Sequence, residues 1–581
     1  MTKAILRRLS SFLIIFLLVN ISAVVAVAGA TTLSEPAAQA AADSRFGAIE
    51  SFWASPEAAA LGAGWERILF YWSEIQPGGP NDWNTLHVLE EWLHDANAHG
   101  RTVVGLLKNT PAWATDGQPF SGVPRGLYLP VDDPGNLWAN YVRRVASYYG
   151  PLGVHNWIVW NEPEIPPGVY GHEFSGSVED YYRLTKVAYQ AAKQVDPNAT
   201  VHLAGWSYWH DQSFLRRFLQ VAAADPEAPS NNYFFDVISL HIYFRSETVP
   251  TIVGSVWATQ SEFGLSKPVW INETNASSNM DPLWPVSRPQ FQVDLEQQAW
   301  YIVQAYALGF HAGAARIAVY KLIDVNIAPG DESWGILRPD FSRRPAYDAY
   351  TTTIKYLRGF TYPIQRQREP SHYIVSFNRP AGITRVMWAR TANAVTIKVP
   401  ALAPSALLVE ATGQATTVTA ENGVYTINLA GARCYGECII GGPPLFLVEE
   451  GVTATSVPTA APAVVGAEAT LVPTATATVT ATATLTPTAT LTPSATPSPT
   501  SSVTPTTTHT PEPTPTNTAR PSPEPTAGPA ATTAAPATTE AAAVAGVIPA
   551  RQASWWFLGA GGTLALLLAA LALKGRLGSR D

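Results

Sequence analysis

Short apolar runs alternate with amphipathic stretches throughout residues 43–358. Runs of about four to eight residues that are rich in Val, Ile, Leu and aromatic side chains are typical of buried parallel strands. On this pattern we predict eight strands, at residues 45–49, 67–71, 102–107, 157–160, 201–205, 237–243, 269–273 and 315–320.

The stretches between these strands have the spacing of apolar residues that an amphipathic helix requires. We predict helices at residues 83–99, 137–149, 178–196, 214–223, 251–263 and 295–309. Repeated strand–helix units favour a (β/α)8 barrel, also called a TIM barrel. A doubly wound open sheet is the alternative, but no Gly-rich phosphate loop follows any of the predicted strands.

After residue 358 the pattern changes to short segments in which apolar and polar residues alternate. Strands are predicted at residues 373–377, 384–389, 394–399, 406–410, 424–429 and 445–448, with turn signals such as Asn422-Gly423 between them. Such alternation is typical of antiparallel sheets. We therefore expect a small β-sandwich over residues 359–450, directly after the predicted barrel at residues 43–358.

Charge and cysteine content exclude several classes of protein. The chain has 37 Lys and Arg against 45 Asp and Glu, a net charge of -8, which gives no electrostatic reason to expect a nucleic-acid partner. Its 2 cysteines are too few for a disulfide-built mini-protein. Cys434 and Cys438 flank a short loop, and a local disulfide is favoured over a metal site because no His lies nearby.

The N-terminus has the organisation of a secretory signal peptide over residues 1–30. A basic start with Lys3 and Arg7 precedes an apolar run, and small residues at 28–30 form a cleavage site. An uncleaved signal anchor is the alternative, because the apolar run is slightly long.

The C-terminal part predicts a tether. Residues 451–553 are rich in Thr, Pro and Ala and lack Phe, Trp and Tyr, so they cannot offset the entropy of ordering and are expected to form a disordered linker. Residues 554–573 are long and apolar enough for a transmembrane helix, and the basic tail at 574–581 is expected in the cytoplasm. We therefore expect an exported protein that is anchored in the plasma membrane with its globular part outside.

Two carboxylates stand where predicted barrel strands end. Glu162 follows the fourth strand in the sequence Asn161-Glu162-Pro163, and Glu273 ends the seventh. If either glutamate is considered alone, an ordinary solvent-exposed loop residue is the alternative interpretation. Because the catalytic groups of TIM barrels lie at the carboxyl ends of the strands, we expect the two to face one cleft.

This arrangement resembles the clan A glycoside hydrolases, which are retaining (β/α)8 enzymes that include families 5, 39 and 42. In that clan an Asn-Glu pair ends the fourth strand, its Glu is the acid/base, and a Glu that ends the seventh strand is the nucleophile. The matching residues are Asn161, Glu162 and Glu273. Further similar segments lie at residues 64–77, 109–113, 236–243 and 334–350.

The resemblance also implies substrate-binding residues. Arg67 matches the Arg that supports the nucleophile, and His241 and Tyr243 match the clan's His-x-Tyr, although a His on an apolar strand is as often structural. Where the clan often has a Trp after the eighth strand, Tyr320 and Lys321 stand here. Sugar C–H faces favour aromatic rings, so Trp113 and Trp206 are candidate stacking platforms.

We therefore expect a retaining glycosidase that acts on an extracellular oligo- or polysaccharide. Glu162 would start protonated and Glu273 ionised, and Asn161 would bind the sugar 2-hydroxyl. A non-catalytic glycan-binding protein is the alternative, and transglycosylation would use the same site. Neither a metal nor a cofactor is expected, because no metal-ligand motif occurs and residues such as Asp281 are interpreted as turn residues.

Overall fold

The computed structural model describes residues 42–453, except residues 288, 290 and 326–330. Four predicted segments lie outside the described residues, namely the signal peptide at 1–30, the linker at 451–553 beyond its first three residues, the membrane helix at 554–573 and the tail at 574–581. Each helix in the described ranges is too short or too polar to cross a membrane.

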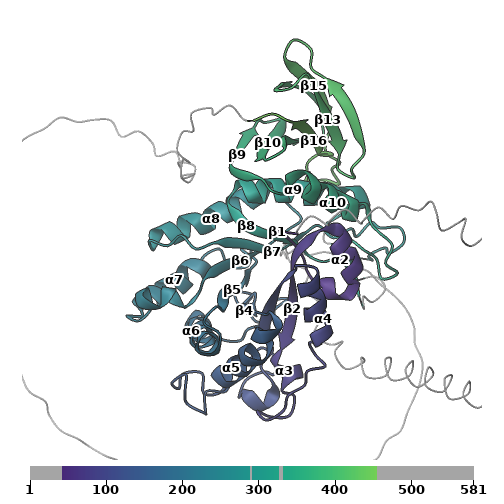
Figure 1. Ribbon diagram of the computed structural model, residues 1–581. Helices are drawn as coiled ribbons and strands as arrows, with labels where there is room; N and C mark the ends of the chain where they lie inside the picture. The colour runs from purple at the N-terminus through teal and green to yellow at the C-terminus, as the bar shows by residue number, and fades with distance from the viewer. Residues whose placement is uncertain (1–41, 288, 290, 326–330, 454–581) are drawn as a thin grey trace, which may run out of the picture. The chain divides into compact units, whose positions relative to one another are not determined.

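Eight parallel strands form a closed barrel (Figure 1). Strands that follow one another in the chain pair with each other, and β8 pairs back onto β1, where Phe46 is opposite Ile317. The (β/α)8 prediction is therefore confirmed, and the open sheet is excluded because the sheet has no edge. The strands are β1 (Asp43–Ala48), β2 (Ala63–Tyr71), β3 (Thr102–Lys108), β4 (Asn156–Asn161), β5 (Thr200–Trp206), β6 (Val237–Tyr243), β7 (Val269–Asn275) and β8 (Ala314–Val319).

Helices follow the strands around the outside of the barrel (Figure 1). Two of the longest helices start at capping boxes, in which Ser177 and Asp294 each accept hydrogen bonds from the first turn. The helices are α2 (Ser55–Leu61), α3 (Trp72–Ile75), α4 (Glu90–Ala98), α5 (Leu137–Tyr149), α6 (Val178–Val195), α7 (Phe214–Ala224), α8 (Val249–Glu262), α9 (Leu295–His311) and α10 (Pro345–Leu357), with 3-10 turns η1 (Ser51–Ala54), η2 (Ala112–Ala114), η3 (Gly150–Leu152), η4 (Pro229–Phe234) and η5 (Ser246–Thr248).

The helix predicted at residues 83–99 is wrong in its first half, because α4 begins only at Glu90. The Asn84 side chain donates a hydrogen bond to the carbonyl of Glu74 and accepts one from the Leu86 amide. These bonds close a turn against the end of α3. Asn favours such local side-chain-to-backbone bonds over helix interiors.

The segment after α10 folds into two antiparallel sheets. One has six strands in the order β14-β13-β16-β11-β10-β9, and the other pairs β12 with β15. Side chains of both sheets, among them Met387, Ile397 and Leu447, share one apolar cluster, so the predicted sandwich is present. The strands are β9 (Thr361–Arg368), β10 (His372–Arg379), β11 (Gly382–Ala389), β12 (Val395–Pro400), β13 (Ser405–Glu410), β14 (Ala415–Thr419), β15 (Val424–Leu429) and β16 (Leu445–Glu450).

Two of these strands, β9 and β14, were not predicted. Both lie at the edges of the six-stranded sheet and expose most of their side chains. Because little of an edge strand is buried, its sequence carries only a weak alternation of apolar and polar residues.

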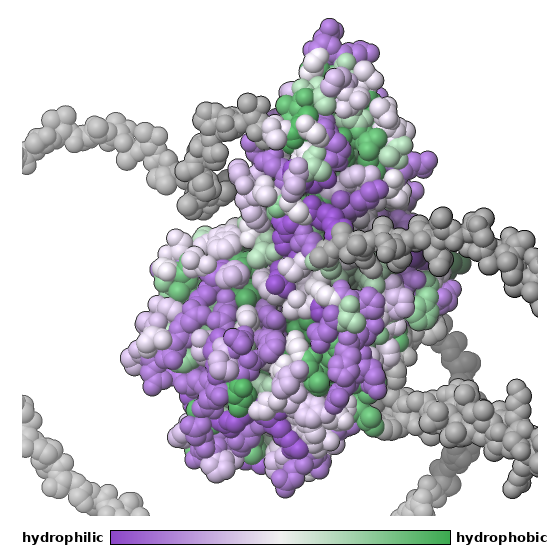
Figure 2. All heavy atoms as spheres, in the orientation of Figure 1, coloured by the Kyte–Doolittle hydropathy of each residue, from purple (hydrophilic) through white to green (hydrophobic). Residues whose placement is uncertain are grey.

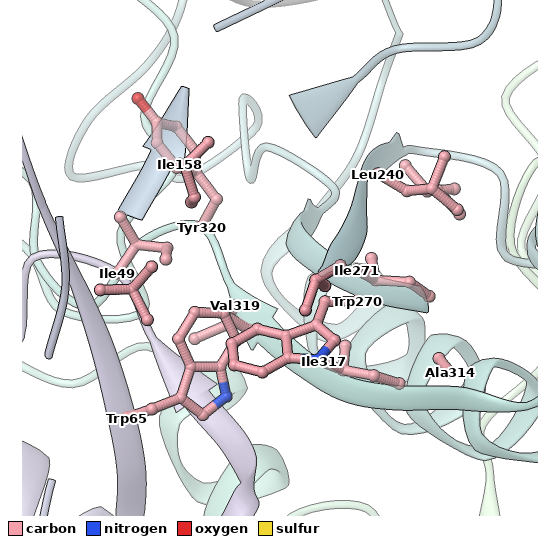
Figure 3. Packing of buried hydrophobic residues seen from close by; sticks show 14 of the residues in the cluster. Ile49, Trp65, Ile158, Leu240, Trp270, Ile271, Ala314, Ile317, Val319 and Tyr320 are labelled. Carbon is pink, nitrogen blue, oxygen red and sulfur yellow. The ribbon is translucent and has the colours of Figure 1, made fainter. Parts of the chain in front are cut away.

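Large buried side chains fill the interior of the barrel. The rings of Trp65 and Trp270 lie 5.2 Å apart, and Ile158 and Ile317 belong to the same buried cluster (Figure 3). Filling of this kind is typical of TIM barrels, whose centre is a packed core and not a pore. It leaves the carboxyl ends of the strands as the place for a site.

The sandwich contacts the barrel through the loop that a disulfide between Cys434 and Cys438 closes. Arg433 forms ion pairs with acidic residues at the start of α9, and Glu437 forms one with Arg245, just after β6. On the face in Figure 2, hydrophilic residues predominate on the barrel and apolar ones form small separate groups, which is ordinary for a protein surface.

Candidate active site

Glu162 and Glu273 line one cavity at the carboxyl ends of the barrel strands. Both side chains are buried, with only 2% and 6% of each residue exposed. The lining of this cavity is mostly polar and consists of Glu50, Arg67, Leu69, Tyr71, Leu106, Lys108, Asn161, Glu162, Glu173, Glu273 and Tyr320.

The end of β4 presents two successive side chains to this cavity. In a regular strand Asn161 and Glu162 would point to opposite faces. The backbone leaves strand geometry at Trp160, with φ 72°, and at Glu162, with φ 40°. Both residues therefore line the cavity. Left-handed backbone conformations are strained in residues other than glycine, and such strain concentrates at functional sites.

Two neighbours favour the ionised form of Glu273. Arg67 on β2 forms an ion pair with one carboxylate oxygen, and the Tyr243 hydroxyl on β6 donates a hydrogen bond to the other. Burial opposes ionisation, but the charges of Arg67 and His241 together with these hydrogen bonds outweigh it. The pKa of Glu273 consequently lies below its ordinary value.

His241 lies between the two carboxylates. Its Nδ1 is 2.7 Å from Glu162 Oε1 and 3.5 Å from Glu273 Oε2. Burial alone would lower the pKa of this ring, but the charge of Glu273 and the hydrogen bond to Glu162 raise it. Because one nitrogen contacts both groups, the two carboxylate oxygens cannot be further apart than the sum of these distances.

Glu162 differs from Glu273 in its tendency to stay protonated. Burial raises its pKa, His241 opposes that effect, and the negative charges of Glu273 and Glu173 add to it, so the net shift is upward. Its Oε2 makes no hydrogen bond within the described part of the protein. A protonated carboxyl beside an ionised one is able to act as an acid next to a nucleophile or base.

Asn161 and Tyr320 stand on the cavity wall, as the sequence predicts. The amide oxygen of Asn161 has no hydrogen-bond partner among the described residues, so it is available to a ligand. The Tyr320 ring lies edge-on to Tyr243, at 6.1 Å between centroids. Trp334, which was not among the predicted site residues, packs against Tyr243 with 4.9 Å between ring centroids. Of these three rings Tyr320 lines the cavity, and together they form an aromatic wall beside it.

Trp113 and Trp206 do not line the cavity. The indole N–H of Trp113 donates to the Gln76 carbonyl, and its ring packs against Trp72. Trp206 is only 5% exposed and its N–H donates to the Asp211 carbonyl. Both indoles are thus engaged in hydrogen bonds inside the barrel domain, and their role as stacking platforms stays a prediction.

Three charged residues that line the cavity, Lys108, Glu173 and Glu50, were not predicted. Lys108, at the end of β3, pairs with Glu173 from the loop after β4. Glu50, just after β1, pairs with Lys321 at 3.2 Å. A charge at the end of an apolar strand was a usable signal for Lys108, as it was for Glu273. Nothing local distinguishes Glu173 from other loop residues.

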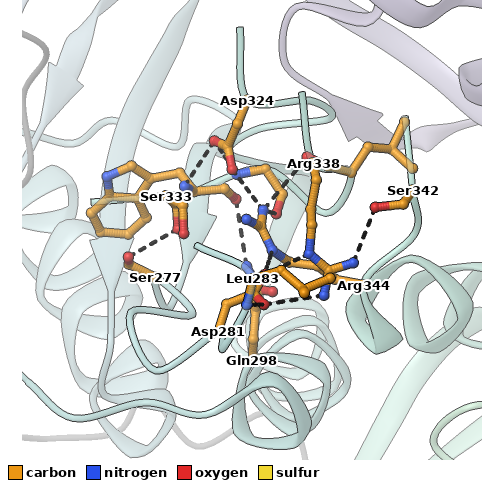
Figure 4. A network of polar contacts seen from close by, with 12 residues as sticks. Ser277, Asp281, Leu283, Gln298, Asp324, Ser333, Arg338, Ser342 and Arg344 are labelled. Carbon is orange, nitrogen blue, oxygen red and sulfur yellow. Dashed lines mark hydrogen bonds and ion pairs between the residues drawn. The ribbon is translucent and has the colours of Figure 1, made fainter. Parts of the chain in front are cut away.

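Asp281 is not the ordinary turn residue that the sequence suggested. It is fully buried in a polar network (Figure 4), where it accepts hydrogen bonds from Arg338 at 2.7 Å and Arg344 at 2.9 Å. Arg344 also forms an ion pair with Asp324, and the Asp324 carboxylate accepts a hydrogen bond from the Trp334 backbone N–H. This network lies behind the aromatic wall. No cluster of three or more metal-ligating side chains occurs in residues 42–453 as described.

Comparison with solved structures finds glycoside hydrolases. A family 39 glycoside hydrolase from Bacteroides cellulosilyticus WH2 matches with 18% identity and a TM-score of 0.56, over 71% of this chain and 82% of that one. A family 30 endoxylanase from Clostridium papyrosolvens C71 matches with 14% identity and a TM-score of 0.48, over 70% and 97%. A β-xylosidase from Caulobacter crescentus CB15 gives 14% and 0.48, over 71% and 97%.

The first of these matches shows that the two chains share a fold, as the resemblance to clan A predicts. No protein-family model and no curated protein matches the sequence. The activity must therefore be argued from the site.

Proposed function

We propose that this protein is a retaining glycoside hydrolase, with Glu162 as acid/base and Glu273 as nucleophile. The observation that carries the proposal is the contact of His241 Nδ1 with both carboxylates, at 2.7 and 3.5 Å. These contacts bring one oxygen of each carboxylate close to one oxygen of the other, and such proximity is in keeping with the separation of about 5–5.5 Å between the carboxyl groups of retaining enzymes.

The proposed reaction has two displacements. Glu162 gives its proton to the glycosidic oxygen while an oxygen of Glu273 bonds to the anomeric carbon, so the leaving group departs as an alcohol. Glu162, now ionised, takes a proton from water, whose oxygen displaces Glu273 and releases the sugar. In this proposal Asn161, whose amide oxygen has no partner among the described residues, binds the 2-hydroxyl, where contacts strengthen in the transition state.

Two glutamine variants test this proposal, because Glu→Gln keeps the shape and removes the ionisable group. E273Q should lose several orders of magnitude in kcat/KM on every aryl glycoside. E162Q should lose most on substrates with a poor leaving group and much less on a dinitrophenyl glycoside, whose leaving group needs no proton. Wild-type rates in either folded variant, or sugar binding without hydrolysis by the wild-type protein, would exclude the proposed enzyme.

We further propose that the enzyme is exported and held at the cell surface. The proposal is supported by the sequence of residues 1–30, of the linker 451–553 and of the apolar segment 554–573. The full chain should appear in the membrane fraction, and a chain that ends at residue 553 should be released into the medium. Retention of the shortened chain in the membrane would contradict the anchor.

A further inference from the structure

The charges around the cavity cancel in pairs. Glu273 pairs with Arg67, and Glu173 with Lys108. Glu50, just after β1, pairs with Lys321, whose side chain is only 5% exposed. Glu162 contacts His241. Apart from Glu162, which the proposed mechanism requires to be protonated, each charged residue on the described cavity wall therefore has a partner of opposite charge.

This pairing has a consequence for the ligand. A buried charge on a ligand is unfavourable unless the site supplies an uncompensated charge of opposite sign. A ligand that competes for Lys108 or Glu50 would leave Glu173 or Lys321 unpaired in a buried place. The paired walls are suited instead to neutral polar groups, which accept and donate hydrogen bonds without breaking an ion pair.

The Lys108–Glu173 pair has spare hydrogen-bonding capacity beside the catalytic carboxyls. An ammonium has three donors and a carboxylate has two acceptor oxygens, so one contact between them leaves donors and acceptors for a ligand. Glu173 is held in place by its backbone carbonyl, which accepts the Trp160 indole N–H at 3.0 Å. Lys108 and Glu173 both line the same cavity as Glu162.

We propose that the cavity receives an uncharged glycosyl unit and that Lys108 and Glu173 determine specificity by binding its hydroxyl groups. This inference rests on the proposed glycosidase function. A hydroxyl both donates and accepts, so two neighbouring hydroxyls of a sugar satisfy an ammonium and a carboxylate together.

The first test compares 4-nitrophenyl glycosides of neutral sugars with the corresponding glucuronide and glucosaminide, using the full-length wild-type protein. At least one neutral glycoside should be hydrolysed with a kcat/KM at least about 100-fold above both charged ones. A charged glycoside as the best substrate would overturn the inference and leave the glycosidase proposal intact. If none is hydrolysed faster than by E273Q, the proposed function itself fails.

The second test uses the best neutral glycoside and its 3-deoxy and 4-deoxy analogues. Wild-type protein should lose about 10- to 100-fold in kcat/KM on at least one analogue, because the charged partners of the missing hydroxyl are left unsatisfied. On the parent glycoside, E173Q and Lys108→Met should each lose a similar factor in kcat/KM relative to the wild-type protein. Within each variant, the change from the parent to that analogue should lower kcat/KM little further. Glu262→Gln, which breaks the exposed pair with Arg216, is the matched control and should change neither rate.

Equal losses on the parent and on both analogues would show that the pair only supports the structure, and would overturn the inference. The wild-type comparison does not depend on how the variants fold. Equal rates of the wild-type protein on the parent and on both deoxy glycosides would overturn it as well.

Discussion

Gly205 and His241 lie in direct contact at the centre of the site. A Cβ atom on Gly205 would lie only 1.9 Å from His241 Nε2. The carbonyl of Gly205 also accepts the Glu162 amide at 3.1 Å. The absence of a side chain at position 205 therefore allows the imidazole to reach the position in which its other nitrogen contacts both carboxylates.

Gly205→Ala should displace the imidazole and weaken both activity and stability. Overpacking of a buried site costs about 1–3 kcal/mol, and we expect kcat/KM to fall at least about 10-fold, since a misplacement of about 1 Å can cost 100-fold. Steady-state kinetics and thermal melting measure the two effects. Gly254→Ala on α8, where nothing lies within 4 Å of the added Cβ, should be neutral or stabilising. Equal behaviour of the two variants would refute this role of Gly205.

The pH dependence of kcat/KM should have two limbs. Activity requires ionised Glu273, whose pKa is lowered, so the rate falls on the acidic side as that group is protonated. It also requires protonated Glu162, whose pKa is raised, so the rate falls on the alkaline side as that proton is lost. A rate that rises steadily through the alkaline range would contradict the assignment of Glu162 as the acid.

Tyr243→Phe should move the acidic limb to higher pH. The hydroxyl donates to Glu273 and lowers the pKa of this carboxyl, so its loss raises that pKa and the nucleophile is protonated sooner as the pH falls. A pH profile of kcat/KM checks the shift. Tyr141→Phe removes another buried hydroxyl, bonded to the Phe70 carbonyl, and should leave the limb in place. A limb that does not move in Tyr243→Phe would contradict this role.

The sugar should be released with the anomeric configuration that it had in the substrate. This follows from direct attack of Glu273 on the anomeric carbon in the proposed mechanism, because two successive displacements restore the original configuration. Proton NMR of the first product, recorded before mutarotation, reports the configuration. Release of the inverted anomer would rule out Glu273 as the nucleophile.

Asp281→Asn should destabilise the fold by about 3–5 kcal/mol, because it leaves the buried charges of Arg338 and Arg344 without their shared partner. The Asn side chain can still accept the hydrogen bond from the Leu283 amide, so the local turn is retained. Urea unfolding measures the change. Asp116→Asn, in an exposed pair with Arg125, is the control and should be close to wild type. A loss no larger than that of the control would refute the structural role of the network.

Much of the site was predictable because barrel topology converts local patterns into spatial ones. An apolar strand that ends in a charge is a local signal, and closure of the sheet brings such ends together. Arg67 and Tyr243 were implied by the resemblance to the clan A glycoside hydrolases, and Glu162 and Glu273 follow from that rule. Trp206 does not, because the sequence alone cannot tell an indole that faces a cavity from one that packs between a strand and a helix.

The amino-acid sequence by itself therefore determined the succession of strands and helices and the two carboxylates at the ends of β4 and β7, since periodicity and strand ends are properties of neighbouring residues. Only the tertiary structure decided which charges neutralise one another. The partners Lys108 and Glu173 are far apart in the chain, and the end of β3 and the loop after β4 bring them together. It also decided that Asn161 and Glu162 share one face, because a left-handed backbone at the end of β4 breaks the alternation that a strand would impose.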